Sequence, residues 1–415
     1  MYLDLALLAG AALLFSIVAG RIDRSWVTGP IVFIVFGFLI GPLGLGLLSM
    51  EVKAGTLKFM AELTLALVLF IDAAGADLKI LRRESAIPIR MLLIGLPLTL
   101  LLGFGGGVLL FGEFSLIEVA ILATLLAPTD AALGQEVVKN KSVPANLRQG
   151  LNAESGLNDG ICVPILFVFL ALASGGAGHG SGEHGGGNYP ALTLLAEELG
   201  IGLLVGVVLV TLAVYGLRYA RTQDWLTPTW VQIPVVALSI TCFATAQYVG
   251  GSGFIAAFCG GLLFGHLMGD NKEELLHSAE GAGDTFALIT WVLFGAAVVG
   301  RAIDHLSWPI VIYTMLSLTV IRMLPIFLSL LGTGVSAEGK WFLGWFGPRG
   351  LASIVFAVIV INADLPHGET ITTVVALTVV LSIVLHGISA KPWSNRWGKS
   401  SHEGPRGDVE AEVNL

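Results

Sequence analysis

Apolar residues follow one another in long runs along this chain, with little of the alternation that marks a half-buried strand. Thirteen runs approach the roughly 20 residues that an α-helix needs to cross a membrane. They cover residues 2–20, 29–49, 57–76, 86–111, 116–138, 147–173, 190–219, 228–248, 251–268, 284–300, 306–331, 339–362 and 369–389. The pattern predicts an all-α polytopic membrane protein with about 13 transmembrane helices.

The polar segments between these runs are short and leave no room for a soluble domain. We therefore expect one transmembrane unit over residues 1–390 and a short cytoplasmic tail over 391–415. No small-residue cleavage site follows the first run, so we expect it to remain as a span. The connection at 174–188 is rich in Gly and His. A flexible linker is favoured there over metal binding or pH sensing.

Basic residues fall mostly on one side of the predicted membrane. With the N-terminus outside, 17 of the 22 Lys and Arg residues lie in cytoplasmic segments and 3 in external ones, while Arg322 and Arg349 lie within runs. Cytoplasmic loops carry such an excess of Lys and Arg. The bias supports the number of runs and predicts a protein of the inner (plasma) membrane with its C-terminus in the cytoplasm.

Two runs are interrupted at corresponding places. Thirteen runs divide into two inverted six-helix repeats, at about 1–173 and 228–390, joined by a linker helix at 190–219. The fifth run is broken at 127–130 and its counterpart, the twelfth, at 347–350, each around a proline. Paired, crossed Pro-broken helices typically carry the binding site of a transporter, so we expect a site at these breaks.

The composition excludes other classes of protein. Of 415 residues, 55% are hydrophobic and 13% are charged, whereas about a quarter of a soluble domain is charged. A net charge of −8 gives no basic surface for nucleic acid. The three cysteines lie inside apolar runs without the spacing of a metal site, and no cofactor is predicted.

Polar and ionisable residues gather in the sixth run. In a helix, Glu154 and Asn158 are i,i+4 neighbours, and so are Ser155 and Asp159, which places all four on one face. Ionisable groups inside a membrane are costly and usually functional. We therefore expect this face to line a cavity or to meet polar partners.

The break in the fifth run would supply such partners. Pro128 has no N–H and disrupts the helix, which would leave backbone carbonyls free beside the Thr129 hydroxyl and the Asp130 carboxylate. Together with the acids of the sixth run, these oxygens can form a cage for a dehydrated cation. Asp159 can also bind a proton, so that cation and H⁺ would compete for one group.

Two buried arginines are expected to offset the acids. Arg322 needs an acidic partner in the membrane, and we predict that this partner is Glu154. Arg349 can neutralise carbonyl ends at the break of the twelfth run or help to hold an acid. Asp130, Glu154 and Asp159 together with both arginines leave one negative charge. One monovalent cation or one H⁺ would cancel it, so the exchange is predicted to be electroneutral.

Other buried polar residues are given lesser roles. The charge count places Glu62 and Asp72, in the third run, outside the moving cavity. For Asp72 an interhelical contact is favoured over a place in an entry funnel. His266 and His386 are lone histidines in small-residue helices and are interpreted as structural.

Four motifs now carry a family resemblance. They are Ala-Pro-Thr-Asp at 127–130, Glu-Ser-Gly-Leu-Asn-Asp at 154–159, the mid-helix Arg322, and Gly-Pro-Arg-Gly at 347–350. In order and spacing they resemble the monovalent cation:proton antiporter superfamily, and within it the electroneutral NhaP-like Na⁺/H⁺ exchanger branch. The resemblance covers essentially the whole membrane region.

The resemblance implies an NhaA/NhaP-like fold and a homodimer embedded in the lipid bilayer. Each protomer would interleave a core and a dimerisation subdomain and reach alternating access by movement of the core. Asp159 would bind the cation and the proton, and Asn158, which matches the Asn of this branch, would also belong to the ion- and proton-binding site. The transported Na⁺ or Li⁺ would be surrounded by Asp159 with Asp130, Thr129, Ser155 and Glu154.

Alternatives remain at this point. A K⁺/H⁺ antiporter of the same fold would use the same oxygen ligands, because cavity size decides between the ions. A channel would need a selectivity ring that the sequence does not show. An intramembrane aspartyl protease could use Asp130 and Asp159, but its Tyr-Asp and Gly-x-Gly-Asp signatures are absent. We therefore expect a transporter and not an enzyme.

Overall fold

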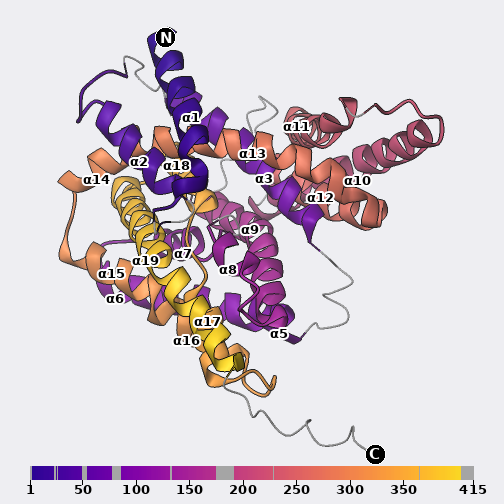
Figure 1. Cartoon of the computed structure of the whole chain (residues 1–415). Helices are drawn as coiled ribbons and strands as arrows, with labels where there is room; N and C mark the ends of the chain where they lie inside the picture. The colour runs from indigo at the N-terminus through magenta and orange to yellow at the C-terminus, as the bar shows by residue number, and fades with distance from the viewer. Residues whose placement is uncertain are drawn as a thin grey trace, which may run out of the picture.

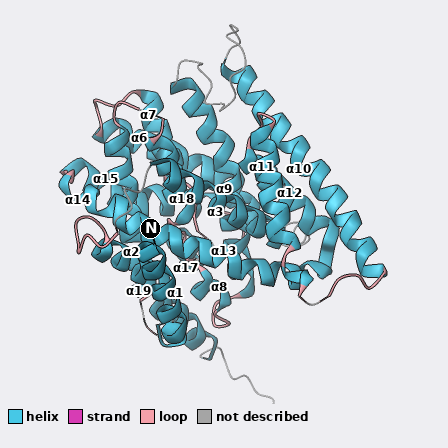
Figure 2. Cartoon of the chain, turned by 90° about the horizontal axis from the view of Figure 1, so that it is seen from above, coloured by secondary structure: helices cyan, strands magenta, loops and turns pink. Residues whose placement is uncertain are grey.

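Helices make up all the regular structure of the described residues. The computed structural model describes residues 2–22, 25, 27–48, 54–76, 86–130, 133–173, 191–227, 229–363 and 365–402. Within these ranges every regular element is a helix, which confirms the all-α prediction (Figure 2). The predicted loop at 174–188 lies outside them.

The helices follow one another along the chain in this order: α1 (Tyr2–Ile22), α2 (Gly29–Ile40), α3 (Ala54–Gly75), α5 (Ala86–Arg90), η1 (Met91–Gly95), α6 (Leu96–Leu110), α7 (Leu116–Leu125), α8 (Gln135–Lys139), α9 (Ala145–Ala173), α10 (Ala191–Thr222), η2 (Trp230–Gln232), α11 (Pro234–Tyr248), α12 (Gly253–Met268), η3 (Gly269–Asn271), α13 (Lys272–Phe294), η4 (Gly295–Val299), α14 (Gly300–Asp304), α15 (Trp308–Leu318), α16 (Val320–Ser329), α17 (Ala337–Trp345), α18 (Leu351–Ile361) and α19 (Gly368–His402).

Each of the thirteen predicted runs contains helix. Within the described residues, eight helical segments are long and apolar enough to cross a membrane, and four shorter apolar helices accompany them. The chain is thus a multi-pass membrane protein.

Several helix ends differ from the predicted ones. The second run was expected to reach residue 49, but α2 ends at Ile40 because Gly41 precedes Pro42, and a residue before proline avoids the α conformation. In the other direction, α13 begins at Lys272, well before the run at 284–300. Glu273 and Glu274 in its first turn suit the positive end of the helix dipole. Likewise α19 continues to His402, past the predicted end at 389.

The helices form three regions in space. In Figures 1 and 2, α10, α11 and α12 lie on one side of the molecule, α6 and α15 lie on the other, and α3, α9 and α13 lie between them. The central α3 packs closely on α12, because a Cβ at Gly261 would lie 2.4 Å from the carbonyl oxygen of Phe70. Only glycine permits this approach of the two backbones.

Two helices are broken where they meet in the interior. One segment ends as α7 at Leu125 and resumes as α8, and the other ends as α17 at Trp345 and resumes as α18. Pro128 and Pro348 cannot continue a helical hydrogen-bond ladder, which explains why both breaks lie there. The N–H of Asp130 donates to the carbonyl of Pro348 at 2.8 Å. The two breaks therefore cross, as their matched positions predict.

The long helix α19 is joined to the start of α7. Glu118 forms a capping box with Ser115 in the first turn of α7. The same carboxylate accepts from the backbone N–H of His367 at 2.9 Å and contacts its ring Nδ1 at 3.1 Å. His367 directly precedes α19, so this contact fixes one end of that helix against a broken one.

A test of the α3–α12 contact follows from its geometry. We expect Gly261→Val to lower the free energy of unfolding by about 1–3 kcal/mol, because the added side chain overpacks the contact. Thermal unfolding of the purified protein measures it. Gly216→Val is the control, since a Cβ at Gly216 on α10 meets nothing within 4 Å. Equal losses in the two variants would contradict the prediction.

Candidate functional site

The polar face predicted in the sixth run is buried against the two breaks. Glu154, Ser155, Asn158 and Asp159 lie on α9 and each is more than 90% buried. The i,i+4 spacing of a helix places them on one side. The structure thus brings together four residues that the sequence singled out.

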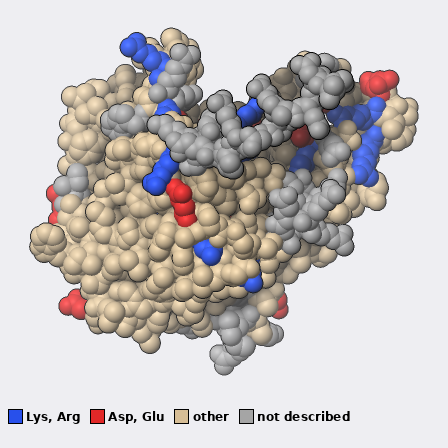
Figure 3. Space-filling view, turned by 60° about the horizontal axis from the view of Figure 1, so that its bottom comes forward, with Lys and Arg blue, Asp and Glu red and all other residues tan. Residues whose placement is uncertain are grey.

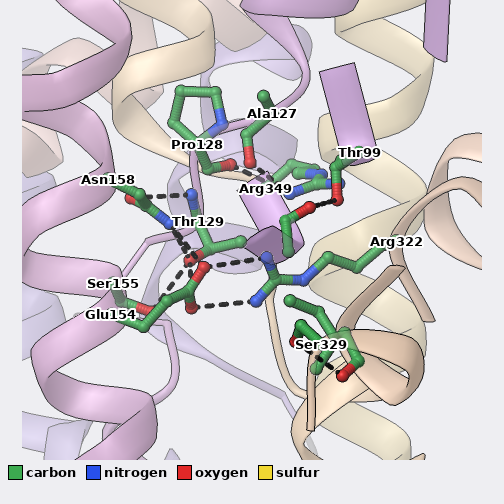
Figure 4. A network of polar contacts seen from close by, with 12 residues as sticks. Thr99, Ala127, Pro128, Thr129, Glu154, Ser155, Asn158, Arg322, Ser329 and Arg349 are labelled. Atoms are coloured by element: carbon green, nitrogen blue, oxygen red, sulfur yellow. Dashed lines mark hydrogen bonds and ion pairs between the residues drawn. The ribbon is translucent and has the colours of Figure 1, made fainter. Parts of the chain in front are cut away.

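Arg322 forms a bidentate ion pair with Glu154 in this buried region. Its Nη1 donates to Oε1 and its Nη2 to Oε2 of Glu154, both at 2.8 Å (Figure 4). Both side chains are almost completely excluded from solvent, at 1% and 0% exposure. The predicted partner of Arg322 is therefore the observed one, and the pair fixes α9 against α16. Buried charges of this kind are tolerated because each satisfies the other.

Thr129 joins the break of the α7 segment to the face of α9. Its backbone N–H donates to Oδ1 of Asn158 at 3.2 Å, and its hydroxyl accepts from Nδ2 of Asn158 at 2.6 Å. The same hydroxyl lies 2.9 Å from Oγ of Ser155 and 3.3 Å from Oε2 of Glu154 (Figure 4). Unwound backbone inside a membrane needs such partners because water is absent. Asn158 supplies one here for the Thr129 N–H, while Ser155 contacts the Thr129 hydroxyl.

Asp130 acts as the cap of the opposite broken helix. Its Oδ2 accepts from the N–H of Leu351, the first residue of α18, at 2.8 Å, and its Oδ1 accepts from the N–H of Leu133 at 3.1 Å. A carboxylate is stabilised at a helix N-terminus by the exposed N–H groups and the helix dipole. A Cβ at Gly350 would lie 2.0 Å from Oδ2 of Asp130, so glycine makes room for the acid.

Arg349 occupies the backbone carbonyls that the sequence predicted as cation ligands. The carbonyls released by Pro128 were expected to be free for a cation, and that expectation is wrong in this conformation. Nη1 of Arg349 donates to the carbonyls of Ala127 at 2.9 Å and of Pro128 at 3.2 Å (Figure 4). A buried guanidinium needs acceptors, and these carbonyls provide them. Of the two roles considered for Arg349, the structure shows the neutralisation of carbonyl ends.

Asp159 differs from Glu154 and Asp130 in its hydrogen bonding within the described residues. Its Oδ1 is buried and accepts no hydrogen bond from any residue that the structure describes. The carboxylates of Asp130, Asp72 and Glu154 are close enough for their charges to act on it. Glu154 is neutralised by Arg322 and Asp130 by a helix end. Of these three acids, Asp159 is therefore the one for which the described residues supply neither an ion pair nor a helix-end contact.

Asp72 lies closer to this site than the sequence analysis placed it. The carbonyl and Cβ of Asp72 on α3 lie 3.5 and 3.9 Å from the position of a Cβ at Gly156, between Ser155 and Asp159. Gly156, a glycine within the polar face of α9, was the sequence signal that the backbone of another helix packs closely there. Asp284 on α13, whose charge acts on Asp72, was not singled out because that run was expected to begin there.

Nearly the whole chain matches the model of one protein family. Residues 8–396 match the family model described as "Sodium/hydrogen exchanger, transmembrane". The chain is 25% identical over 398 residues to the K(+)/H(+) antiporter NhaP of Alkalimonas amylolytica, covering 95% of this chain and 66% of that protein. It is 23% identical over 310 residues to a Na(+)/H(+) antiporter of Schizosaccharomyces pombe, covering 68% and 65%. The chain thus spans about two thirds of the length of these relatives.

A solved structure has the same fold. The sodium proton antiporter MjNhaP1 from Methanocaldococcus jannaschii at pH 8 superposes with a TM-score of 0.73 at 21% identity, covering 95% of this chain and 97% of that one. The likeness concerns the arrangement of helices, and it agrees with the fold that the sequence motifs imply.

The ion pair of Glu154 and Arg322 gives a stability test. Breaking a buried pair from one side costs about 3–5 kcal/mol. We expect Glu154→Ala and Arg322→Ala each to lower thermal stability sharply, and the double variant to lose much less than the sum.

A matched control is available for this cycle. Arg221 on α10 and Glu274 on α13 form an ion pair at 2.9 Å whose side chains are 38% and 63% exposed. Exposed pairs contribute about 0–1 kcal/mol, so a cycle on these two residues should show little coupling. Additive losses at Glu154 and Arg322 would show that the two are not energetic partners.

Proposed function

The chain belongs to the sodium/hydrogen exchanger family, and on this basis we propose that it is a secondary active transporter that exchanges Na⁺ or Li⁺ for H⁺. The observation that carries the proposal is the buried carboxylate of Asp159, whose Oδ1 accepts no hydrogen bond from the described residues where the two broken helices meet α9. A group of this kind is costly unless it gains a positive charge. Either a cation or a proton supplies that charge, so the two compete for Asp159.

The neighbours of Asp159 support a cation site of oxygen atoms. We propose that Asp159 supplies the charge and that the hydroxyls of Thr129 and Ser155, 2.9 Å apart, supply neutral ligands. Asp130 and Glu154 complete the negative charge around the ion, although in this conformation they bond Leu351 and Arg322. Asn158 orients Thr129 rather than binding the ion.

The packing of the helices supports the two inverted repeats. If each of the first six spans corresponds to the span seven places later, α13 is the counterpart of α3, and α12 is the counterpart of α2. The contact of α3 with α12 then has a counterpart in the contact of α13 with α2, and both contacts are observed. The contacts of α7 with α9 and of α18 with α19 correspond in the same way. We propose repeats at about 1–173 and 228–390, with α10 as the linker.

The division into two repeats suggests which helices move during transport. In our proposal the core subdomain contains both broken helices and α9, and it moves against α3 and α13 to give alternating access. The protein would be a homodimer of the plasma membrane with its N-terminus outside. The 17-to-3 distribution of basic residues in the sequence supports that orientation.

A K⁺/H⁺ antiporter is the second candidate. Some relatives are named as antiporters of K⁺ and others of Na⁺, and both ions accept oxygen ligands. Reconstituted vesicles with a pH-sensitive dye, challenged with Na⁺, Li⁺ and K⁺ in turn, distinguish the candidates. Family membership supports transport rather than peptide hydrolysis by Asp130 and Asp159.

Removal of the Asp159 charge is the direct test. We expect Asp159→Asn to abolish cation-driven proton flux in these vesicles while the protein still folds, because an amide cannot bind a proton in place of the carboxylate. Asp224→Asn is the control, since Asp224 lies in an exposed turn with φ of 56° that Asn also adopts. Substantial flux in Asp159→Asn would refute the assignment.

Competition for one group predicts the pH dependence of transport. With equal pH on both sides, the rate should pass through a maximum, because protons displace the cation at low pH and proton loading fails at high pH. A higher Na⁺ concentration should move the acid limb to lower pH. An acid limb that stays in place as Na⁺ rises would indicate a proton site separate from the cation site.

Charge balance predicts electroneutral exchange of one cation for one proton. Three acids and two arginines leave the core with one negative charge, which either ligand cancels, so that no net charge crosses the low dielectric. Glu62 pairs with Lys58 and does not alter this count. We propose that Asp72 stays with α3 when the core moves.

The stoichiometry is measured in vesicles with an imposed membrane potential at fixed ion gradients. We expect the rates of the wild type and of Asp72→Asn to be independent of the potential. A rate that the potential accelerates or slows in the wild type would contradict one-for-one exchange. A dependence on potential that differs between the two proteins would show that Asp72 belongs to the moving charge.

A further inference from the structure

Two residues of α19 face the two ends of the break between α17 and α18. Nε2 of His386 lies 2.7 Å from the carbonyl oxygen of Trp345, the last residue of α17. Oγ of Ser382 accepts from the backbone N–H of Arg349 at 2.7 Å, two residues before α18 begins. Both side chains are buried, His386 at 4% and Ser382 at 0% exposure. One turn of α19 thus spans the gap in the opposite helix.

The neighbours of the two ring nitrogens of His386 limit which nitrogen donates a hydrogen bond and which accepts one. A backbone carbonyl only accepts, so Nε2 of His386 must carry a hydrogen. The other nitrogen, Nδ1, lies 3.2 Å from the hydroxyl and 2.6 Å from the carbonyl of Ser382. In the neutral ring with its hydrogen on Nε2, Nδ1 accepts from the Ser382 hydroxyl, and in the protonated ring Nδ1 donates to the Ser382 carbonyl.

The break needs these partners because its backbone has lost its helical ones. The carbonyl of Trp345 lies at a helix C-terminus, where it accepts from the N–H of Gly347 at 2.8 Å and contacts His386 as a second partner. The N–H of Arg349 lies in unwound chain, and a buried peptide group without a partner is costly. The side chains of α19 therefore hold the two ends at a set separation.

The separation of the two ends is transmitted to the ion site. Arg349, whose N–H is held by Ser382, places its guanidinium on the carbonyls of Ala127 and Pro128. The carbonyl of Pro348, between the two held ends, accepts from the N–H of Asp130. A shift of the break would therefore move the backbone on both sides of Thr129.

We propose that His386 and Ser382 are positioning residues, which hold the α17–α18 break and thereby set the geometry with which the site binds its cation. They do not contact the ion themselves. Both are polar residues of a mostly apolar helix. The part of this proposal that concerns cation binding rests on the proposed function.

The first experiment measures cation dependence of exchange in reconstituted vesicles. We expect His386→Leu to raise the half-saturating cation concentration about tenfold, because the Trp345 carbonyl then keeps only its bond from the N–H of Gly347 and the break can shift. The maximal rate should change less. His386→Gln, which can still donate to Trp345, should restore the half-saturating concentration to within about twofold of the wild type.

Ser382→Ala and Ser389→Ala form a matched pair on the same helix. Ser382→Ala should raise the half-saturating concentration, since it removes the acceptor of the Arg349 N–H. Ser389 accepts from the indole N–H of Trp345 at 2.8 Å and touches no backbone of the break, so Ser389→Ala should leave that concentration unchanged. Equal effects of the two variants would overturn the proposal, because they would indicate loss of packing alone.

Hydrogen–deuterium exchange provides a second readout that does not depend on transport. In Ser382→Ala the peptide that contains residues 346–350 should exchange faster than in the wild type and in Ser389→Ala. Unchanged exchange in that peptide would overturn the inference even if the protein transports cations. Faster exchange in a protein that transports no cation would instead contradict the proposed function and leave the positioning of the break supported.

Discussion

The bidentate pair of Glu154 and Arg322 is the interaction on which the rest of the interior depends. It neutralises two charges where water is excluded, and it joins α9 to α16 at the level of the breaks. Beside this pair, Asn158, which also donates to Oε1 of Glu154 at 3.1 Å, and Ser155 hold Thr129. The buried Oδ1 of Asp159, which accepts no hydrogen bond from the described residues, is tolerated because its surroundings are otherwise balanced in this way.

Each broken helix is completed by groups from the other. Asp130 of one break caps α18 of the second, while Arg349 of the second occupies the carbonyls of the first. The structure thereby supplies partners for backbone groups at the C-terminal end of α7 and at the N-terminal end of α18. The helix α19 adds contacts at two levels, through His367 to α7 and through His386 to α17. The site is consequently a set of backbone positions held by charged and polar side chains.

Local pattern predicted most of the fold and part of the site. Long apolar runs locate the helices, prolines locate the breaks, and i,i+4 spacing locates the face of α9. The end of α2 and the start of α13 were missed because a run of apolar residues is not the same as a helix: Gly41 before Pro42 stops one, and acidic residues extend the other.

The contacts of the site could be predicted only where charge left a single choice. Few acidic residues lie deep in the membrane-spanning runs, so Glu154 could be predicted as the partner of Arg322. The occupation of the 127 and 128 carbonyls by Arg349 and the approach of Asp72 to Gly156 depend on how segments distant in sequence pack. The fit of Asp130 against Gly350 also constrains sequence change. Any side chain at position 350 would occupy the volume of the acid, so a descendant of this protein that replaces Gly350 must also replace Asp130, and a larger residue at 350 should be found only where the acid has been lost.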